Sequence, residues 1–260
     1  MELGLSGKTA LVTGSSRGIG RGIALALADE GCNVVLSGRD AGALAEVAAS
    51  VRAKGPRAEA VALDLRDAGA AATLVEATRS QFGGLDILVN NAGATKRGDF
   101  FALGDADWQD GFALKLFAHV RLARAAWPLL QERRGSLVTI GGTSGRKPHA
   151  SFAIGSSVNA ACAAFSKALA DLGKQDGVQV NCIHPSLVDT DRQGRRIAAE
   201  MTRTGEPEAA IRAQFCRETG ITRFGTTADV AGLVCFIVSQ HGSWLHGATI
   251  DLDGGEIPVL

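Results

Sequence analysis

The sequence contains no tyrosine, only two methionines, and aromatic residues at just 5% of its 260 positions. It also has no apolar run close to the roughly 18 residues that a membrane-spanning helix needs. The first residues lead directly into a strand-like segment and lack the layout of a secretory signal. We therefore expect no membrane partner, and any chemistry that depends on a phenolic hydroxyl is excluded.

The chain also has no excess of charge of either sign: its 27 lysines and arginines balance its 27 aspartates and glutamates, so its formal net charge is zero. Nucleic-acid-binding domains usually carry a basic excess, so we expect no nucleic-acid partner. The chain has no C-x-x-C pair, and its five cysteines are scattered: Cys32, Cys162, Cys182, Cys216 and Cys235. This pattern indicates neither a disulfide framework nor a metal site, and it fits a reducing cytoplasm.

Glycine is abundant, at 33 residues, and apolar strand-like segments alternate with helical ones. The periodicity predicts helices over 19–30, 41–54, 68–82, 105–130 and 152–172. It predicts strands over 9–13, 34–37, 58–63, 86–90, 136–140, 178–183 and 249–252. Strands separated by helices form right-handed crossovers and a parallel sheet covered on both faces. We predict one doubly wound, Rossmann-type α/β domain over 1–260 with a seven-stranded parallel sheet, and a polar flap over the substrate site at 189–223.

A glycine-rich loop, TGSSRGIG at 13–20, lies between the first strand and the first helix. Its G-x-x-x-G-x-G spacing allows a tight turn and lets a pyrophosphate approach the amino end of the helix, where free N–H groups favour anions. The loop therefore predicts nucleotide binding. The residues expected to bind are Gly14, Ser16, Arg17, Gly18, Ile19 and Gly20.

The end of the second strand predicts which nucleotide is bound. An acidic residue there would bind the ribose hydroxyls of NAD, but the sequence is Ser37-Gly38-Arg39. The guanidiniums of Arg39 and Arg17 suit a 2′-phosphate. Asp40 is better explained as the N-cap of the helix that begins at position 41. We therefore favour NADP(H) over NAD(H).

The whole chain from about Ser6 to Gly255 resembles the short-chain dehydrogenase/reductase family. The resemblance rests on TGSSRGIG (13–20), LDL (63–65), NNAG (90–93), HPSLVDT (184–190) and DLDGG (251–255). It implies that Asp64 and Leu65 contact the adenine and that Asn91, Ala92 and Gly93 line the adenosine ribose. It further implies that Pro185, Val188 and Thr190 hold the nicotinamide carboxamide. The family also implies a homodimer or homotetramer, and it leaves the identity of the small-molecule substrate open.

The family's four catalytic residues have no counterpart in this chain. Family reductases use an asparagine, a serine and a Tyr-x-x-x-Lys pair, in which the tyrosine protonates the carbonyl oxygen. Alignment places these positions at Lys115, Gly142, Gly155 and Asn159, with Thr143 and Ser144 beside the serine position. Since the chain has no tyrosine, we expect that the usual carbonyl-reductase mechanism cannot operate.

The replacements suggest candidate site residues, each with a plainer alternative. Gly155 is expected to leave space for a bulkier ligand in the substrate pocket, or else reflects drift after loss of activity. Lys115 shares a helical stripe with Trp108, Phe112 and His119, so it is either a functional half-buried lysine or one that extends to solvent. His149, in the loop 146–151, is a candidate acid or an ordinary exposed histidine.

The apparent exchange between Lys115 and Asn159 suggests compensation. A lysine at 115 could carry its nitrogen into the region that the family lysine occupies, while Asn159 holds a water molecule. Three functions stay open at this point. The first is an NADP(H)-dependent oxidoreductase of unusual mechanism, the second is an inactive NADP(H)-binding pseudoenzyme, and the third is a non-redox lyase, isomerase or cyclase.

Overall fold

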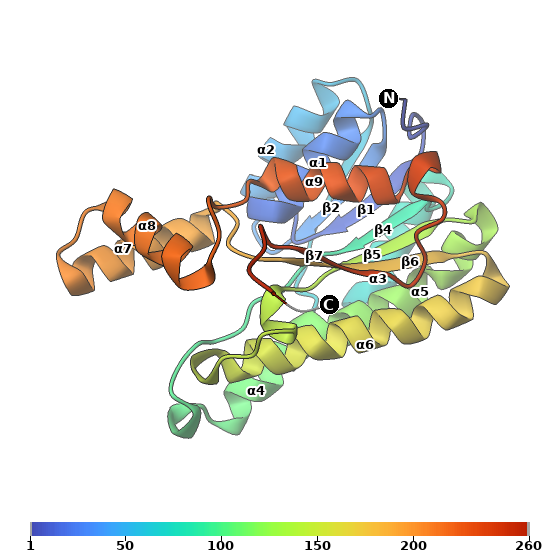
Figure 1. The fold of residues 1–260 in the computed structure, drawn as a ribbon. Coiled ribbons are helices and arrows are strands. Elements are labelled where there is room, and N and C mark those ends of the chain that lie inside the picture. The colour runs from blue at the N-terminus through green and yellow to red at the C-terminus, as the bar shows by residue number, and fades with distance from the viewer. Residues whose placement is uncertain (1, 259–260) are drawn as a thin grey trace.

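A computed structural model describes residues 2–258 of the chain, which form a seven-stranded sheet covered by helices on both faces (Figure 1). All neighbouring strands are parallel, and their order is β3-β2-β1-β4-β5-β6-β7. This confirms the predicted doubly wound fold. The strands are β1 (Thr9–Thr13), β2 (Asn33–Gly38), β3 (Ala58–Ala62), β4 (Ile87–Asn90), β5 (Ser136–Ile140), β6 (Gln179–Pro185) and β7 (Thr249–Leu252).

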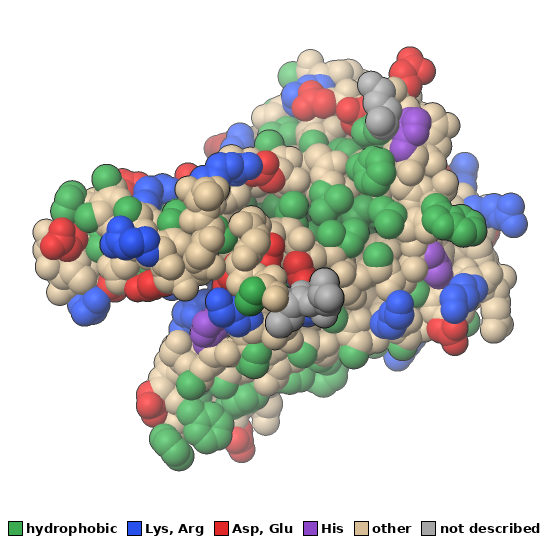
Figure 2. All heavy atoms as spheres, in the orientation of Figure 1, with side chains coloured by type: hydrophobic (Ala, Val, Ile, Leu, Met, Phe, Trp, Pro, Cys, Tyr) green, Lys and Arg blue, Asp and Glu red, His purple; other side chains and the backbone are tan. Residues whose placement is uncertain are grey.

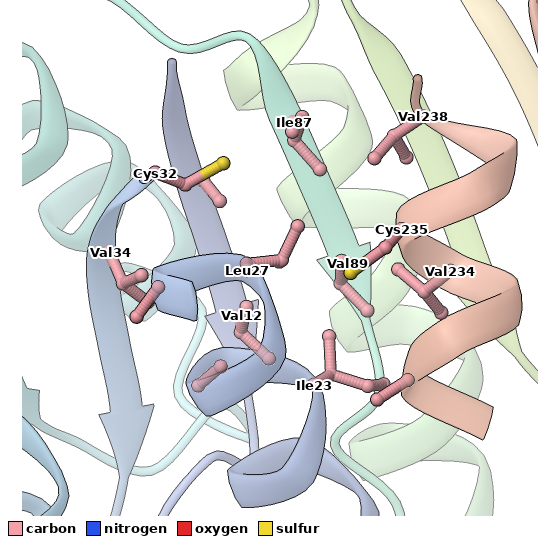
Figure 3. Packing of buried hydrophobic residues seen from close by; sticks show 14 of the residues in the cluster. Val12, Ile23, Leu27, Cys32, Val34, Ile87, Val89, Val234, Cys235 and Val238 are labelled. Carbon is pink, nitrogen blue, oxygen red and sulfur yellow. The ribbon is translucent and has the colours of Figure 1, made fainter. Parts of the chain in front are cut away.

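Alternate residues of the central strands face opposite layers of helices, as the two-residue period of a strand requires. On one face, Val12 and Val89 pack with α1 (Gly18–Asp29), α2 (Ala41–Arg52) and α9 (Thr227–Ile237). Figure 3 shows the side chains of α1 and α9 that meet over these strands. On the other face, Leu11 and Leu88 pack with α3 (Ala70–Phe82) and α5 (Ala118–Arg133). The long α6 (Ala153–Asp176) and the shorter α4 (Asp105–Phe112) complete that second layer.

Two helical features differ from the sequence-based prediction. The helix α9 was not predicted, although Thr226 and Asp229 form a capping box at its start. The helix predicted over 105–130 is interrupted, because a π-helical segment at Ala113–Phe117 separates α4 from α5. Lys115 lies at the middle of that segment, and π-helical turns are frequent at functional sites.

The segment 189–223 forms α7 (Asp191–Thr204) and α8 (Glu208–Thr219), which project from one end of the sheet (Figure 1). Ile197, Ile211 and Phe215 form a small apolar cluster between them. We name α7 and α8 the projecting segment. Short 3₁₀ turns complete the structure at Phe100–Ala102, Thr143–Gly145, Ala150–Phe152 and Gln240–Gly242. Among the described residues, no helix is long and apolar enough to cross a membrane.

Candidate active site

The glycine-rich loop lines a cavity of about 290 Å³ at the carboxyl ends of the central strands. Arg17, the N-cap of α1, makes no side-chain cap bond, and the first turn of α1 holds no acidic residue. The first N–H groups of the helix are therefore free for an anion. A Cβ at Gly20 would lie 2.3 Å from the Gly14 carbonyl oxygen, so this turn requires glycine at position 20. All six residues predicted to bind the nucleotide line this cavity.

Asn91 and Ala92 hold the glycine-rich loop against β4. The Asn91 side-chain amide donates to the carbonyl oxygens of Thr13, at 2.8 Å, and Gly14, at 3.3 Å. The backbone N–H groups of Asn91 and Ala92 both donate to the Thr13 hydroxyl at 3.0 Å. Asn91, Ala92 and Gly93 line the cavity, and Asn91 also fixes the loop that forms it.

The two arginines predicted to select the nucleotide are exposed at the same cavity. Arg39 lies 3.8 Å from a carboxylate oxygen of Asp64, whose carboxylate also accepts from the Arg66 backbone N–H at 3.0 Å. Asp40 accepts from the Ala43 N–H at the start of α2, which is the capping role predicted for it. Arg39 and Arg17 are thus accessible to a ligand, and Asp40 is committed to its helix.

A larger cavity of about 630 Å³ opens beside the first. The two cavities share part of their lining, including Ile19, Gly93, Lys115, Gly141 and Thr190, so they form one continuous cleft. Most of the residues predicted for catalysis, substrate or nicotinamide binding line the larger cavity: Lys115, Gly142, Thr143, Ser144, His149, Asn159, Pro185, Val188 and Thr190.

Lys115 lies where the two cavities join. Its Nζ donates a 2.9 Å hydrogen bond to the Gly141 carbonyl oxygen. Its side chain passes over Gly93, where a Cβ would lie 2.9 Å from Lys115 Cδ. Burial lowers the pKa of Lys115 from its usual value of 10.5, and the nearby Arg192 adds to this effect. The nitrogen is therefore fixed inside the cleft and does not extend into bulk solvent.

Asn159 lies next to Gly142 and lines the larger cavity. Its Nδ2 donates to the Ser144 hydroxyl at 2.9 Å, while its buried Oδ1 has no hydrogen-bond partner among residues 2–258. A Cβ at Gly142 would lie 2.8 Å from Asn159 Nδ2. A serine at position 142 and an asparagine in this rotamer therefore exclude each other.

The expectation that Gly155 leaves space for a ligand is wrong. The Phe152 ring fills that space, because a Cβ at Gly155 would lie 2.2 Å from Phe152 Cζ. Phe152 is 7% exposed, and the Arg97 guanidinium covers its ring at 3.7 Å from the centroid. Gly155 is absent from the lining of the larger cavity, whereas Phe152 and Arg97 both belong to it.

The histidines have different environments. His149 is exposed at the rim of the larger cavity, and its backbone N–H donates to the Ser156 hydroxyl. His184 is buried and its Nδ1 accepts from the Gly142 N–H at 2.8 Å, which assigns the proton to Nε2. Burial lowers the pKa of His184 to about 4 and that of His119 to about 3. Both are thus neutral near pH 7, and His184 shapes the turn at Gly142.

Three arginines in the larger cavity were missed from the sequence: Arg97, Arg192 and Arg196. The last two are four residues apart within α7, a spacing that puts both on one helix face and could have been recognised. The basic residues of the loop 146–151 lie near carboxylates, since Arg146 lies 3.4 Å from Asp251 and Lys147 lies 4.0 Å from Glu256. Across positions 2–258, no cluster of His, Cys, Asp and Glu could hold a metal ion.

Comparison with known proteins places this geometry in context. Residues 8–201 match the family model described as short chain dehydrogenase. An uncharacterized oxidoreductase of Mycobacterium tuberculosis is 35% identical over 96% of this chain and 92% of its own length. The 3-oxoacyl-[acyl-carrier-protein] reductase of Escherichia coli is 31% identical over 99% of this chain and 100% of its own length. The structure of L-sorbose reductase from Gluconobacter frateurii, complexed with NADPH and L-sorbose, superposes with a TM-score of 0.97 at 34% identity, covering 100% of both chains.

Proposed function

The chain belongs to the short-chain dehydrogenase family, and from that premise we propose that it is an NADP(H)-dependent oxidoreductase acting on a small organic substrate. The observation that carries this proposal is the position of Lys115. Its side chain lines both the nucleotide cavity and the larger cavity, so a single group reaches a bound nicotinamide and a bound substrate. The sorbose reductase complex, which contains NADPH, supports the choice of cofactor.

The residues at the nucleotide cavity fit NADP(H). The uncapped start of α1 and the close approach of Gly20 to Gly14 suit a pyrophosphate, and exposed Arg17 and Arg39 suit a 2′-phosphate. Asp64 and Leu65 line the end of the cavity where an adenine would lie in this family. When bound, the cofactor supplies or accepts a hydride; every other role falls to the side chains of this chain.

The proposed active site works without the phenolic acid of the family. Gly155 stands at the tyrosine position, and the apolar Phe152 ring occupies the space next to it. Lys115 places its amine beside the reacting centre, because its Nζ is fixed by the Gly141 carbonyl oxygen; burial lowers the pKa of this amine. Asn159, whose buried Oδ1 has no hydrogen-bond partner among residues 2–258, positions a water molecule for proton exchange with that amine.

Such a site favours substrates that require little acid catalysis. Reduction of a conjugated C=C bond or of an already protonated imine leaves less negative charge on oxygen than reduction of an isolated ketone. General acid catalysis contributes roughly 10²–10⁴-fold, so ketones and β-ketoacyl thioesters should be reduced slower by about that factor than in a family reductase. We propose that the enzyme discriminates between these two substrate groups.

The test is to follow the absorbance of reduced nicotinamide with matched conjugated and saturated ketones. We expect NADPH oxidation with the conjugated compound and little or none with the saturated one. The variant Lys115→Met should lose this activity, whereas Lys8→Met, a change outside both cavities, should retain it. Ketone turnover near ~10 s⁻¹ would contradict the proposal, since that is the median of ordinary enzymes. Conversion of a substrate without nicotinamide oxidation would favour a lyase or isomerase instead.

A further inference from the structure

The larger cavity carries a charge that the chain as a whole does not. The formal net charge of the protein is zero, yet five cationic side chains line this cavity and only two acidic ones do. The cationic residues are Arg97, Lys115, Lys147, Arg192 and Arg196, and the acidic ones are Glu218 and Glu256. Figure 2 shows basic side chains (blue) gathered at the recess between the projecting segment and the loops beneath it.

The two acids are engaged with neighbours other than the three arginines. Glu256 accepts a hydrogen bond from the Ser186 hydroxyl and lies 4.0 Å from Lys147 Nζ. Glu218 accepts from the Gln214 side-chain amide at 2.7 Å. The acids of the cavity therefore do not neutralise its arginines.

Arg97, Arg192 and Arg196 make no ion pair or side-chain hydrogen bond with any residue in the range 2–258. Arg97 stacks on the Phe152 ring at 3.7 Å and Arg196 on the Phe215 ring at 4.3 Å, contacts that fix each guanidinium and leave its N–H groups free. Burial lowers the pKa of Arg97 to about 10, and the charges of Arg196 and Arg192 contribute to this shift. Three arginines that form no ion pair within residues 2–258 thus line one cavity.

The arginines reach the cavity from different elements of the fold. Arg97 belongs to the loop after β4, whereas Arg192 and Arg196 belong to α7 of the projecting segment. Between the two arginines of α7 lies Gln193, which is 9% exposed, lines the same cavity, and has a buried Nε2 without a hydrogen-bond partner in the described chain. The N–H groups of these side chains are hydrogen-bond donors, and arginine donors suit an oxyanion.

We propose that the substrate of this enzyme is a small organic anion, a carboxylate or a phosphate monoester, whose charged group is held by Arg97 and Arg196 with Arg192 and Gln193. That the anion is the substrate rests on the proposed oxidoreductase function, whereas the binding of an anion in this cavity does not. Arg97 and Arg196 line the larger cavity alone, whereas Arg192 lines both cavities, so a ligand held by Arg97 and Arg196 is distinct from the phosphates of the nucleotide. The apolar part of the anion lies against Phe152, Leu187 and Val188, which line the same cavity.

Calorimetry with matched probes tests the proposal. The carboxylates benzoate and cinnamate and the phosphate monoester phenyl phosphate are compared with benzamide, cinnamamide and phenol, which have similar shapes and no charge. Each titration is run with and without saturating NADP⁺, because the nucleotide blocks the anion site at the start of α1. We expect at least one anion to bind at least tenfold more tightly than its neutral counterpart, and the preferred probe identifies the anion as carboxylate or phosphate.

Substitutions of the cavity arginines test whether the anion binds in the larger cavity. Arg97→Gln and Arg196→Gln should each reduce anion affinity by about tenfold or more, since charge-assisted hydrogen bonds are lost, and should leave NADP⁺ affinity unchanged. Arg217→Gln, which removes a charge from α8 outside both cavities, is the matched control and should change neither affinity. Equal affinity for every anion and its neutral counterpart, or anion binding unaffected by both cavity variants, would overturn the inference. Anion binding that persists while NADP⁺ fails to bind would overturn the proposed function and leave the anion site intact.

Discussion

The close approach of the Phe152 ring to Gly155 predicts the sign of the change in stability that Gly155→Ala causes. Replacing glycine by alanine in a helix normally stabilises a protein by up to about 1 kcal/mol. At position 155, however, the added Cβ would lie 2.2 Å from Phe152 Cζ, far inside contact distance. Overpacking of this kind costs about 1–3 kcal/mol. We therefore expect Gly155→Ala to destabilise the protein by roughly 1–2 kcal/mol.

A double-mutant cycle separates this clash from other effects. Phe152 is 7% exposed, so Phe152→Ala alone should cost about 3–5 kcal/mol. In the double variant the alanine at 155 enters the space left by the ring, and the two losses should not add. We expect a coupling of about 1–3 kcal/mol between the two positions. Urea unfolding monitored by circular dichroism measures these values, provided that the m-value stays constant.

The matched control is Gly232→Ala in α9, where a Cβ would meet no atom of residues 2–258 within 4 Å. This variant should be stabilised by roughly 0.5–1 kcal/mol, as expected for an exposed helical glycine. If Gly155→Ala were stabilised to the same extent, the position would be open space and the Phe152 ring would lie elsewhere. The account of an active site closed by an apolar ring would then be refuted.

Three further predictions concern the cofactor and Lys115. NADPH should bind more tightly than NADH by about 1–3 kcal/mol in calorimetry, and Arg39→Ala should remove most of that difference; equal affinities in the parent protein would exclude the proposed 2′-phosphate site. Because burial lowers the pKa of Lys115, the folded state binds fewer protons than the unfolded state between that lowered pKa and about 10.5, so stability gains a contribution as pH rises through this interval. Lys115→Met should lack that gain. If the free energies of unfolding of the two proteins, measured across this pH interval, changed in parallel, the burial of a titrating amine would be disproved. Finally, the double variant Lys115→Asn with Asn159→Lys should bind NADPH more tightly than either single variant. If a double-mutant cycle shows no coupling between the two positions, the residues at 115 and 159 do not compensate for each other.

The strands were the most predictable part of the fold, because strands of a buried parallel sheet form short apolar runs bounded by turns. Those at Thr9–Thr13, Ser136–Ile140 and Thr249–Leu252 agree with the prediction at both ends. The helix Thr227–Ile237 was missed because its sequence is apolar on most of its faces and therefore lacks a clear helical period. The π-helical segment Ala113–Phe117 has no sequence signal that distinguishes it from the α-helix around it.

The candidate site was predictable where backbone spacing determines it. The glycine-rich loop and the positions of Lys115 and Asn159 in the cleft follow from motifs with fixed spacing. The fate of the space beside Gly155 did not follow, because it depends on the rotamer of Phe152 and on Arg97, more than 50 residues earlier in the chain. A small residue indicates a vacancy only when no neighbouring side chain turns into it, and sequence alone does not specify that packing.

The central claim, redox turnover in a site without the family tyrosine, is tested most directly by isotope transfer. The protein is incubated with NADPH deuterated at the transferable nicotinamide position and with cinnamate or with a conjugated enone that carries the anionic group preferred in the titrations, and the products are analysed by mass spectrometry. The account predicts a reduced product that carries the deuterium, formed in proportion to NADPH oxidised and absent with Lys115→Met. A product without the label, or no product while NADPH and the anion both bind, would contradict it and identify the protein as a non-redox enzyme or a binding protein, respectively.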